Sequence, residues 1–187
     1  MTVYVFAGPI GSGKSSIIPS YIEEHQLEDV EYICPALYSS ELFSSIINVS
    51  DRNNAAYTFA KHKRERLLSE GKPMIIETML SSRNIISFLE NAHTLGYKII
   101  SVFVGTDSPQ LNIMRVNKQT TESHQTISPN RICQLYYCSM KNLKALSQVS
   151  DELYVFDNTP NSPHLVSASI NHTNSFSNNV PEWAKNI

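Results

Sequence analysis

The sequence predicts an α/β fold in which helices cover both faces of a parallel β-sheet. Short apolar segments alternate with helical segments of about ten residues or more, which is the pattern of βαβ units. The first apolar segment, Val3 to Ala7, runs directly into a glycine-rich stretch that is followed by a helical pattern. The 187 residues are enough for one domain with a well-buried hydrophobic core and too few for two domains of typical size.

Each predicted strand is a short apolar run that lies between turn residues and a helical segment. The predicted strands are Thr2–Ala7, Asp29–Cys34, Pro73–Glu77, Tyr97–Gly105 and Glu152–Phe156. The predicted helices show a helical spacing of apolar residues, and Gly96 ends one of them. They are Lys14–Glu24, Asp51–Glu70, Arg83–Leu95, Pro109–Lys118 and Pro129–Gln148.

The C-terminal part differs in composition from the rest of the chain. Residues 158–179 are rich in Asn, Ser, Thr and Pro, and the helical spacing disappears. Either 164–170 and 175–180 form a small hairpin, or this part is disordered, and the composition leaves both open. We therefore predict one domain over 1–157 and a tail over 158–187, with a hairpin and a short helix packed on the domain as its ordered form.

Charge and composition exclude several classes of protein. The net charge of −2 creates no field that would attract nucleic acid or a membrane surface. No apolar run approaches the roughly 18 residues that a membrane-spanning helix needs, and the N-terminus lacks the basic flank of a signal peptide. The basic segment 61–66 is interpreted as the solvated face of a helix. Three cysteines without a CxxC pair indicate reduced thiols, so we expect a cytoplasmic protein.

The glycine-rich stretch fits the pattern GxxxxGK[ST] of a phosphate-binding loop. Glycines let backbone N–H groups turn toward the phosphates of a nucleotide, and the following helix directs its positive end at them. Lys14 is expected to contact the β- and γ-phosphates, and the Ser15 hydroxyl is expected to bind Mg²⁺. The alternative is a glycine-rich turn with an exposed lysine. The predicted site for ATP and Mg²⁺ consists of Gly8, Pro9, Ile10, Gly11, Ser12, Gly13, Lys14, Ser15 and Ser16.

The loop alone does not select a reaction, but other motifs narrow the choice. A GTPase would carry an NKxD segment after a strand, whereas Asn117-Lys118-Gln119-Thr120 lacks the Asp and falls in a predicted helix. A transporter-type ATPase would carry an LSGGQ-like signature, which is absent from the sequence. A kinase needs the loop, an acidic region for the phosphate acceptor and cationic groups on a lid.

Three cations flank the polar stretch 119–128 and are candidates for such a lid. Arg115 and Lys118 are three residues apart on a predicted helix and so share one face. With Arg131, they are candidate catalytic residues that would stabilise charge on the transferred phosphoryl group. The alternative for each is a solvated position on a helix.

The end of the third predicted strand carries candidate substrate-binding residues. Glu77 ends the apolar run PMIIE, and ligands of parallel sheets bind at the carboxyl ends of the strands. It could orient a magnesium-bound water or contact the acceptor, or instead interact with the start of the next helix. Ser82 and Arg83 follow on the same rim, although Arg83 could equally be a surface residue that opens the next helix.

Several segments, taken in order, resemble the zeta-toxin family. These are VYVFAGPIGSGKSS, EGKPMIIETMLSSRN, GYKIISVFVGTDSPQL and the later pair Tyr136-Tyr137. The similarity covers residues 2 to 157 and is greatest to small bacterial zeta-like P-loop kinases, also described as predicted ABC-type ATPases. The resemblance implies a P-loop kinase fold, a three-layer sandwich around a five-stranded parallel sheet. It also implies ATP-dependent phosphorylation of a sugar hydroxyl of UDP-N-acetylglucosamine and, by analogy, an antitoxin-like protein partner.

The match to the family is complete on the ATP side and incomplete on the acceptor side. The loop matches fully, Glu77, Ser82 and Arg83 match the third-strand motif, and Arg115 matches the lid arginine. The family has an Asp after the second strand that serves as base for the acceptor hydroxyl, whereas residues 32–37 contain no acid. Thr58 and Lys118 stand where the family commonly has arginines.

Two hypotheses follow from this mismatch. Either the protein is a small-molecule kinase in which another acid, such as Glu41 or Asp51, replaces the missing base, or it is an ATP-binding module that has lost phosphoryl transfer.

Overall fold

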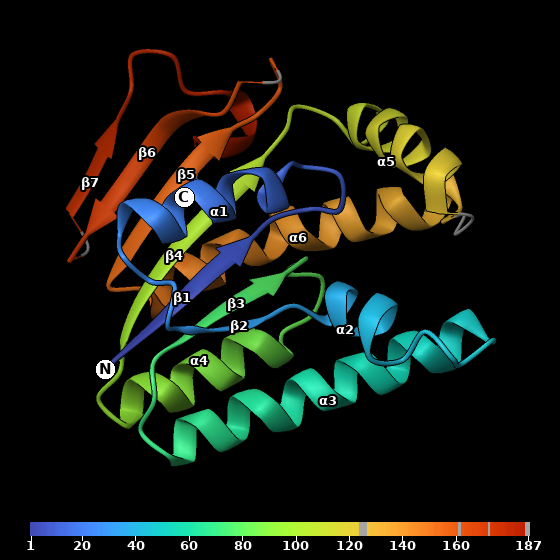
Figure 1. Cartoon of the computed structure of the whole chain (residues 1–187). Coiled ribbons are helices and arrows are strands. Elements are labelled where there is room, and N and C mark those ends of the chain that lie inside the picture. The colour runs from blue at the N-terminus through green and yellow to red at the C-terminus, as the bar shows by residue number, and fades with distance from the viewer. Residues whose placement is uncertain (124–126, 161, 172, 186–187) are drawn as a thin grey trace.

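A single mixed β-sheet of seven strands organises the chain (Figure 1). The computed structural model describes residues 1–123, 127–160, 162–171 and 173–185. The strand order is β2-β3-β1-β4-β5-β6-β7. The strands are β1 (Thr2–Ala7), β2 (Glu31–Ile33), β3 (Met74–Thr78), β4 (Lys98–Gly105), β5 (Glu152–Asp157), β6 (His164–Ile170) and β7 (Thr173–Phe176).

The first five strands are parallel, which confirms the predicted α/β fold. The predicted hairpin is also present, and it is part of the main sheet. β6 pairs antiparallel with β5, and β7 pairs antiparallel with β6, so the hairpin extends the same sheet by two strands. The second strand of the hairpin begins earlier than predicted, because Asn171 adopts a left-handed conformation (φ 48°) and turns the chain there.

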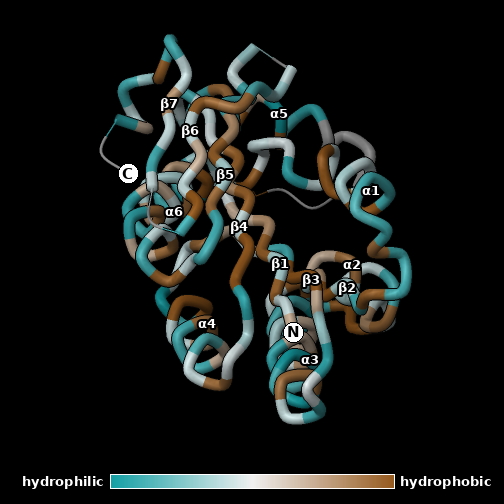
Figure 2. The backbone as a smooth tube through the Cα atoms, turned by 90° about the vertical axis from the view of Figure 1, so that its left-hand side faces the viewer, coloured by the Kyte–Doolittle hydropathy of each residue, from teal (hydrophilic) through white to brown (hydrophobic). Residues whose placement is uncertain are grey.

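Helices cover both faces of the sheet. They are α1 (Lys14–Glu24), α2 (Pro35–Glu41), α3 (Val49–Ser69), α4 (Asn84–Thr94), α5 (Pro109–Ser123), α6 (Pro129–Val149) and the 3₁₀ turn η1 (Glu182–Ala184). Figure 2 places α1 on one side of the row of strands and α3, α4 and α6 on the other. The sequence did not predict α2, because a helix of seven residues, the first of them Pro35, is too short to show a helical spacing.

Two apolar layers hold the helices to the sheet. On the α1 face, Ile18 packs against Phe6, Ile75 and Val102. On the other face, residues of α3, α4 and α6 form a larger cluster with Val5, Ile76 and Phe103. Hydrophobic residues therefore gather along the central strands in Figure 2. Burial of each such Ile, Val or Phe side chain contributes about 1.5–3 kcal/mol.

The strand register brings four chain segments to one edge of the sheet. The last residue of β1, Ala7, lies beside Thr78 of β3 and Phe103 of β4. Gly105 of β4 lies beside Asp157 of β5. The segments that leave the carboxyl ends of these strands start at this edge, which is where ligands bind in parallel α/β sheets.

The C-terminal turn packs against β4. The Trp183 ring lies 6.2 Å from the Phe103 ring, centroid to centroid. It also covers Gly105, where an added Cβ would come within 2.3 Å of the indole. Among the described helices, none is both long and apolar enough to cross a membrane.

Candidate active site

The segment Gly8–Ser15, here called the phosphate loop, connects β1 to α1. Its conformation requires glycine at two positions in particular. Gly8 has φ 142°, and a Cβ there would lie 2.2 Å from the backbone oxygen of Val104. Gly13 has φ 94°, and a Cβ there would lie 2.2 Å from the side-chain nitrogen of Asn158. At these two positions the loop packs so closely on β4 and on the segment after β5 that a side chain does not fit.

Two asparagines tie the loop to distant elements. Asn112 of α5 donates to the backbone oxygen of Ile10 (2.7 Å), and the Thr106 hydroxyl orients the Asn112 amide by donating to it (2.5 Å). Asn158 donates to the backbone oxygen of Ser12 (2.8 Å). Neither asparagine was predicted. Asn158 directly follows β5, so its place at the carboxyl end of a strand was a usable signal, whereas Asn112 lies within a helix and has none.

Lys14 is a buried cation inside the loop. Its side chain is 6% exposed, and Nζ donates to the backbone oxygens of Gly8 and Pro9, each at 2.9 Å. Burial lowers the pKa of Lys14 to about 8, while the charges of Glu77 and Cys34 oppose this effect. α1 begins here without a side-chain cap, so its first N–H groups and the positive end of its dipole also face the loop. Both features favour an anion at this position.

Glu77 lies next to the phosphate loop and is held by three side chains. The Ser15 hydroxyl donates to Glu77 Oε1 (3.0 Å). The Tyr32 hydroxyl and the Cys34 thiol, which comes within 3.5 Å, both donate to Oε2. Burial raises the pKa of Tyr32, and its hydrogen bond to Glu77 raises it further. The sequence suggested no role for Tyr32 or Cys34, because the strand-end residues that meet Glu77 come from another strand.

The oxygen atoms of Ser15 and Glu77 suit Mg²⁺, which binds through one or two protein ligands, waters and substrate phosphates. Among the residues that the structure describes, no group of three or more His, Cys, Asp or Glu side chains could form a separate metal site. Ser15 and Glu77 are the residues that would hold a magnesium ion together with the phosphates of a nucleotide.

Arg115, one of the three candidate lid cations, contacts a residue that is bonded to the phosphate loop. Arg115 of α5 donates from Nη2 to the backbone oxygen of Asn158 (2.7 Å), which in turn holds the loop. Lys118 is exposed one turn further along α5. Arg131 is exposed at the start of α6, where its guanidinium contacts Gln134 of the same helix (3.4 Å). Part of the predicted polar lid, residues 124–126, lies outside the described residues.

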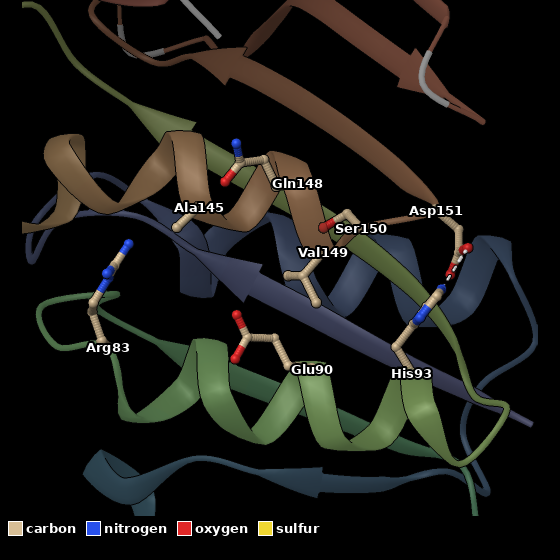
Figure 3. A pocket seen from close by; sticks show the side chains of 8 residues that line it. All are labelled: Arg83, Glu90, His93, Ala145, Gln148, Val149, Ser150 and Asp151. Atoms are coloured by element: carbon tan, nitrogen blue, oxygen red, sulfur yellow. Dashed lines mark ion pairs between the residues drawn. The ribbon is translucent and has the colours of Figure 1, made fainter.

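The candidate substrate-binding residues are not gathered at one point. Ser82 is exposed, and Arg83 is the residue that precedes α4. The Arg83 side chain lines a pocket of about 280 Å³ between α4 and α6, together with Glu90 and with His93, which pairs with Asp151 at 3.5 Å (Figure 3). Glu77, by contrast, contacts the phosphate loop.

The two candidate replacement acids both lie near helix ends. Glu41 ends α2, and Asp51 lies in the first turn of α3, and both are exposed.

The sheet order, the phosphate loop and its lysine define a P-loop kinase fold. No protein-family model matches the sequence, and no curated protein sequence is significantly similar to it. The solved structures are more informative. The AvrRxo1-ORF1:-ORF2 complex with ATP superimposes with a TM-score of 0.76 over 95% of this chain at 15% identity.

Two further structures support the same fold. The structure from the PezAT toxin–antitoxin system of Streptococcus pneumoniae has a TM-score of 0.68 and 17% identity, covering 89% of this chain and 71% of that one. A putative kinase from Chloroflexus aurantiacus has a TM-score of 0.60 and 12% identity, covering 86% of this chain and 87% of that one. The resemblance to zeta-toxin-like P-loop kinases is thereby confirmed at the level of the fold. This chain spans only 60% of the AvrRxo1 chain.

Proposed function

We propose that the protein is a P-loop kinase that transfers the γ-phosphoryl group of ATP to a hydroxyl of a small molecule. A nucleotide sugar such as UDP-N-acetylglucosamine is the first acceptor to test. The observation that carries the proposal is the buried Lys14 ammonium in a glycine loop, next to a Ser15–Glu77 pair at the carboxyl edge of the sheet. A cytoplasmic location is part of this proposal, because the three cysteines are free thiols and free thiols are typical of reducing compartments.

The residues around the loop suit nucleotide binding and charge stabilisation, two of the requirements of phosphoryl transfer. The loop N–H groups and Lys14 would hold the triphosphate, and Lys14 would exchange its bonds to Gly8 and Pro9 for phosphate oxygens. Mg²⁺ would neutralise charge on the β- and γ-phosphates. Arg115, which is linked to the loop by two hydrogen bonds through Asn158, would stabilise charge on the transferred group.

Glu77 is our candidate for the base that acts on the hydroxyl group of the acceptor. The P–O bond to ADP breaks, a bond to the acceptor oxygen forms, and the hydroxyl proton must leave. Position 36, where the family has its Asp, is an alanine in the first turn of α2. Glu77 is held in place by Tyr32 and Ser15, so its carboxylate is oriented before any substrate binds. It would accept the proton or orient a magnesium-bound water.

The alternative is an ATP-binding module without transfer. The absence of an acid at Ala36 and the lysine at position 118 favour this alternative. A base is not indispensable, however, because positioning and charge stabilisation account for most of phosphoryl-transfer catalysis.

The two functions predict different outcomes in one experiment. Purified protein is incubated with ATP, Mg²⁺ and a panel of UDP-sugars, and the products are followed by mass spectrometry, with Lys14→Ala as the matched control. A phosphorylated acceptor with wild-type protein, absent with Lys14→Ala, supports the kinase. If calorimetry detects ATP binding that Lys14→Ala abolishes, but no acceptor is phosphorylated, the binding module is supported. Turnover that appears only with Ala36→Asp would support it further.

A protein partner is a second proposal, supported by the comparisons alone. Two of the similar structures come from systems of two proteins, the AvrRxo1-ORF1:-ORF2 complex and the PezAT toxin–antitoxin system. We propose that an antitoxin-like protein encoded beside this one binds it. Co-expression of a tagged copy with the neighbouring gene product and co-purification would test this, and failure of the two to co-purify would contradict it.

A further inference from the structure

A groove of about 610 Å³ lies between α3 and α4. The two helices run side by side on the same face of the sheet (Figure 1). α3 contributes Tyr57, Lys61 and Arg64, which are spaced four and three residues apart and so share one side of the helix. α4 contributes residues along its whole length, from Asn84 and Phe88 to Asn91, and Leu95 follows the helix. The phosphate loop contributes none of the lining residues, so the groove is a separate feature.

Arg64 is a buried arginine that has no carboxylate partner among the residues described by the structure. The sequence placed it on a solvated helix face, yet its side chain is only 7% exposed. Its guanidinium lies over the Phe88 ring, 5.0 Å from the centroid, and its Nε has no hydrogen-bond partner. Among the described residues, Arg64 forms no ion pair with a carboxylate. Buried charges are normally paired, because an uncompensated charge in a protein interior is unfavourable.

The other charges of the groove do not neutralise Arg64. Glu65 is the one carboxylate among the described residues that line it, and its oxygens lie 3.9 Å from Lys61 and 3.8 Å from His62. Burial alone would raise the pKa of the Tyr57 hydroxyl, but hydrogen bonds from Asn84 and Arg64, together with the charge of Arg64, outweigh burial and lower this pKa. The groove is therefore electropositive around Arg64 and Tyr57.

The start of α4 adds to this positive character. Its first residue is Asn84, and Arg83 precedes it without a side-chain cap, so the first N–H groups of this 11-residue helix keep their bonding capacity. The dipole of the helix is positive at this end. The Asn84 amide lies 3.5 Å from the Tyr57 hydroxyl, so polar donors and the buried guanidinium lie in the same part of the groove.

We propose that the groove between α3 and α4 binds a small organic anion, a molecule with one phosphate or carboxylate group and an apolar or ring-shaped body. The anionic group would supply the counter-charge that Arg64 lacks, with Tyr57 and Asn84 as hydrogen-bond partners. The body would pack on Phe88 and on Leu68, which also lines the groove. The volume falls within the roughly 300–1,000 Å³ that is usual for such sites.

Phenyl phosphate and benzoate are suitable probes, because each joins an aromatic ring to one of the two anionic groups. Each is titrated into ¹⁵N-labelled full-length protein, and amide shifts are followed by NMR, for wild type and for Lys14→Ala. We expect at least one probe to shift amides of α3 and α4 in both proteins, since the site does not include the phosphate loop. Phenyl phosphate alone would indicate a phosphate ligand, and benzoate alone or both probes would indicate that a carboxylate is accepted.

Two substitutions on α3 distinguish probe binding in the groove from nonspecific attraction of the probe to surface charge. Arg64→Met should weaken probe binding by about tenfold, as expected for loss of a charge-assisted contact. Arg66→Met is the matched control, because Arg66 is exposed and pairs with Glu70 instead. If Arg64→Met does not fold, Tyr57→Phe decides, with a loss of about threefold expected. Binding of neither probe, binding that disappears in Lys14→Ala, or equal effects of the decisive variant and Arg66→Met would overturn the proposal.

Discussion

The buried lysine of the phosphate loop should make the stability of the nucleotide-free protein rise with pH. Lys14 has a pKa of about 8 in the folded protein, against 10.5 as its ordinary value, chiefly because burial disfavours the ammonium form. Below pH 8 the lysine is protonated in both the folded and unfolded states. Between pH 8 and 10.5 the unfolded chain binds more protons, so the free energy of unfolding increases by about 1.4 kcal/mol per pH unit. Over the whole interval the gain is about 3 kcal/mol.

The assay compares wild type with Lys14→Met by urea unfolding between pH 7 and 10, without nucleotide and with EDTA. Loss of the bonds to Gly8 and Pro9 changes the stability of the variant at every pH, so only the slope of the difference is informative. Burial raises the pKa of Tyr21 to about 12, which lowers stability above pH 10 in both proteins and cancels in the difference. A difference that stays flat or falls between pH 8 and 10 would show that Lys14 is not a buried, destabilised ammonium.

Three further predictions concern the site and its support. Tyr32→Phe removes a hydrogen bond to Glu77, so kcat should fall by about tenfold with the KM for ATP nearly unchanged, as steady-state kinetics would show. A change in the KM for ATP as large as the change in kcat would argue that Tyr32 does not act by orienting Glu77. Asn158→Ala removes a bond to the phosphate loop, so calorimetry should show ATP binding weakened by about tenfold and urea unfolding a loss of about 1–2 kcal/mol. Unchanged affinity would contradict this. Gly105→Ala places a Cβ against the Trp183 indole and should destabilise the protein by about 2 kcal/mol in urea, whereas Gly105→Ala combined with Trp183→Leu should lose less than the sum of the two single changes. Additive losses would show that the two residues are not in contact.

The residues around the phosphate loop, at the carboxyl edge of the sheet, differ in how far the sequence could reveal them. The phosphate loop was predictable because glycine and lysine at fixed spacing are required by the backbone geometry itself, as at Gly8 and Gly13. Glu77 was predictable from its place at the end of an apolar strand. Tyr32 and Asn158 were missed because their roles depend on which strand ends lie side by side. The motif around Arg83 did not reveal that this side chain also lines the pocket between α4 and α6, because that pocket is formed by helix packing.

By itself, the sequence determined the α/β class, the five parallel strands and the phosphate loop, because these depend on local spacing and on backbone conformations available mainly to glycine. Only the tertiary structure decided which side chains meet across long separations, such as Asn158 with Ser12. It also decided that Arg64, in a segment rich in charge, is buried against Phe88. Such contacts depend on strand order and helix packing, which bring together residues that are far apart in the sequence and whose pairing no local pattern indicates.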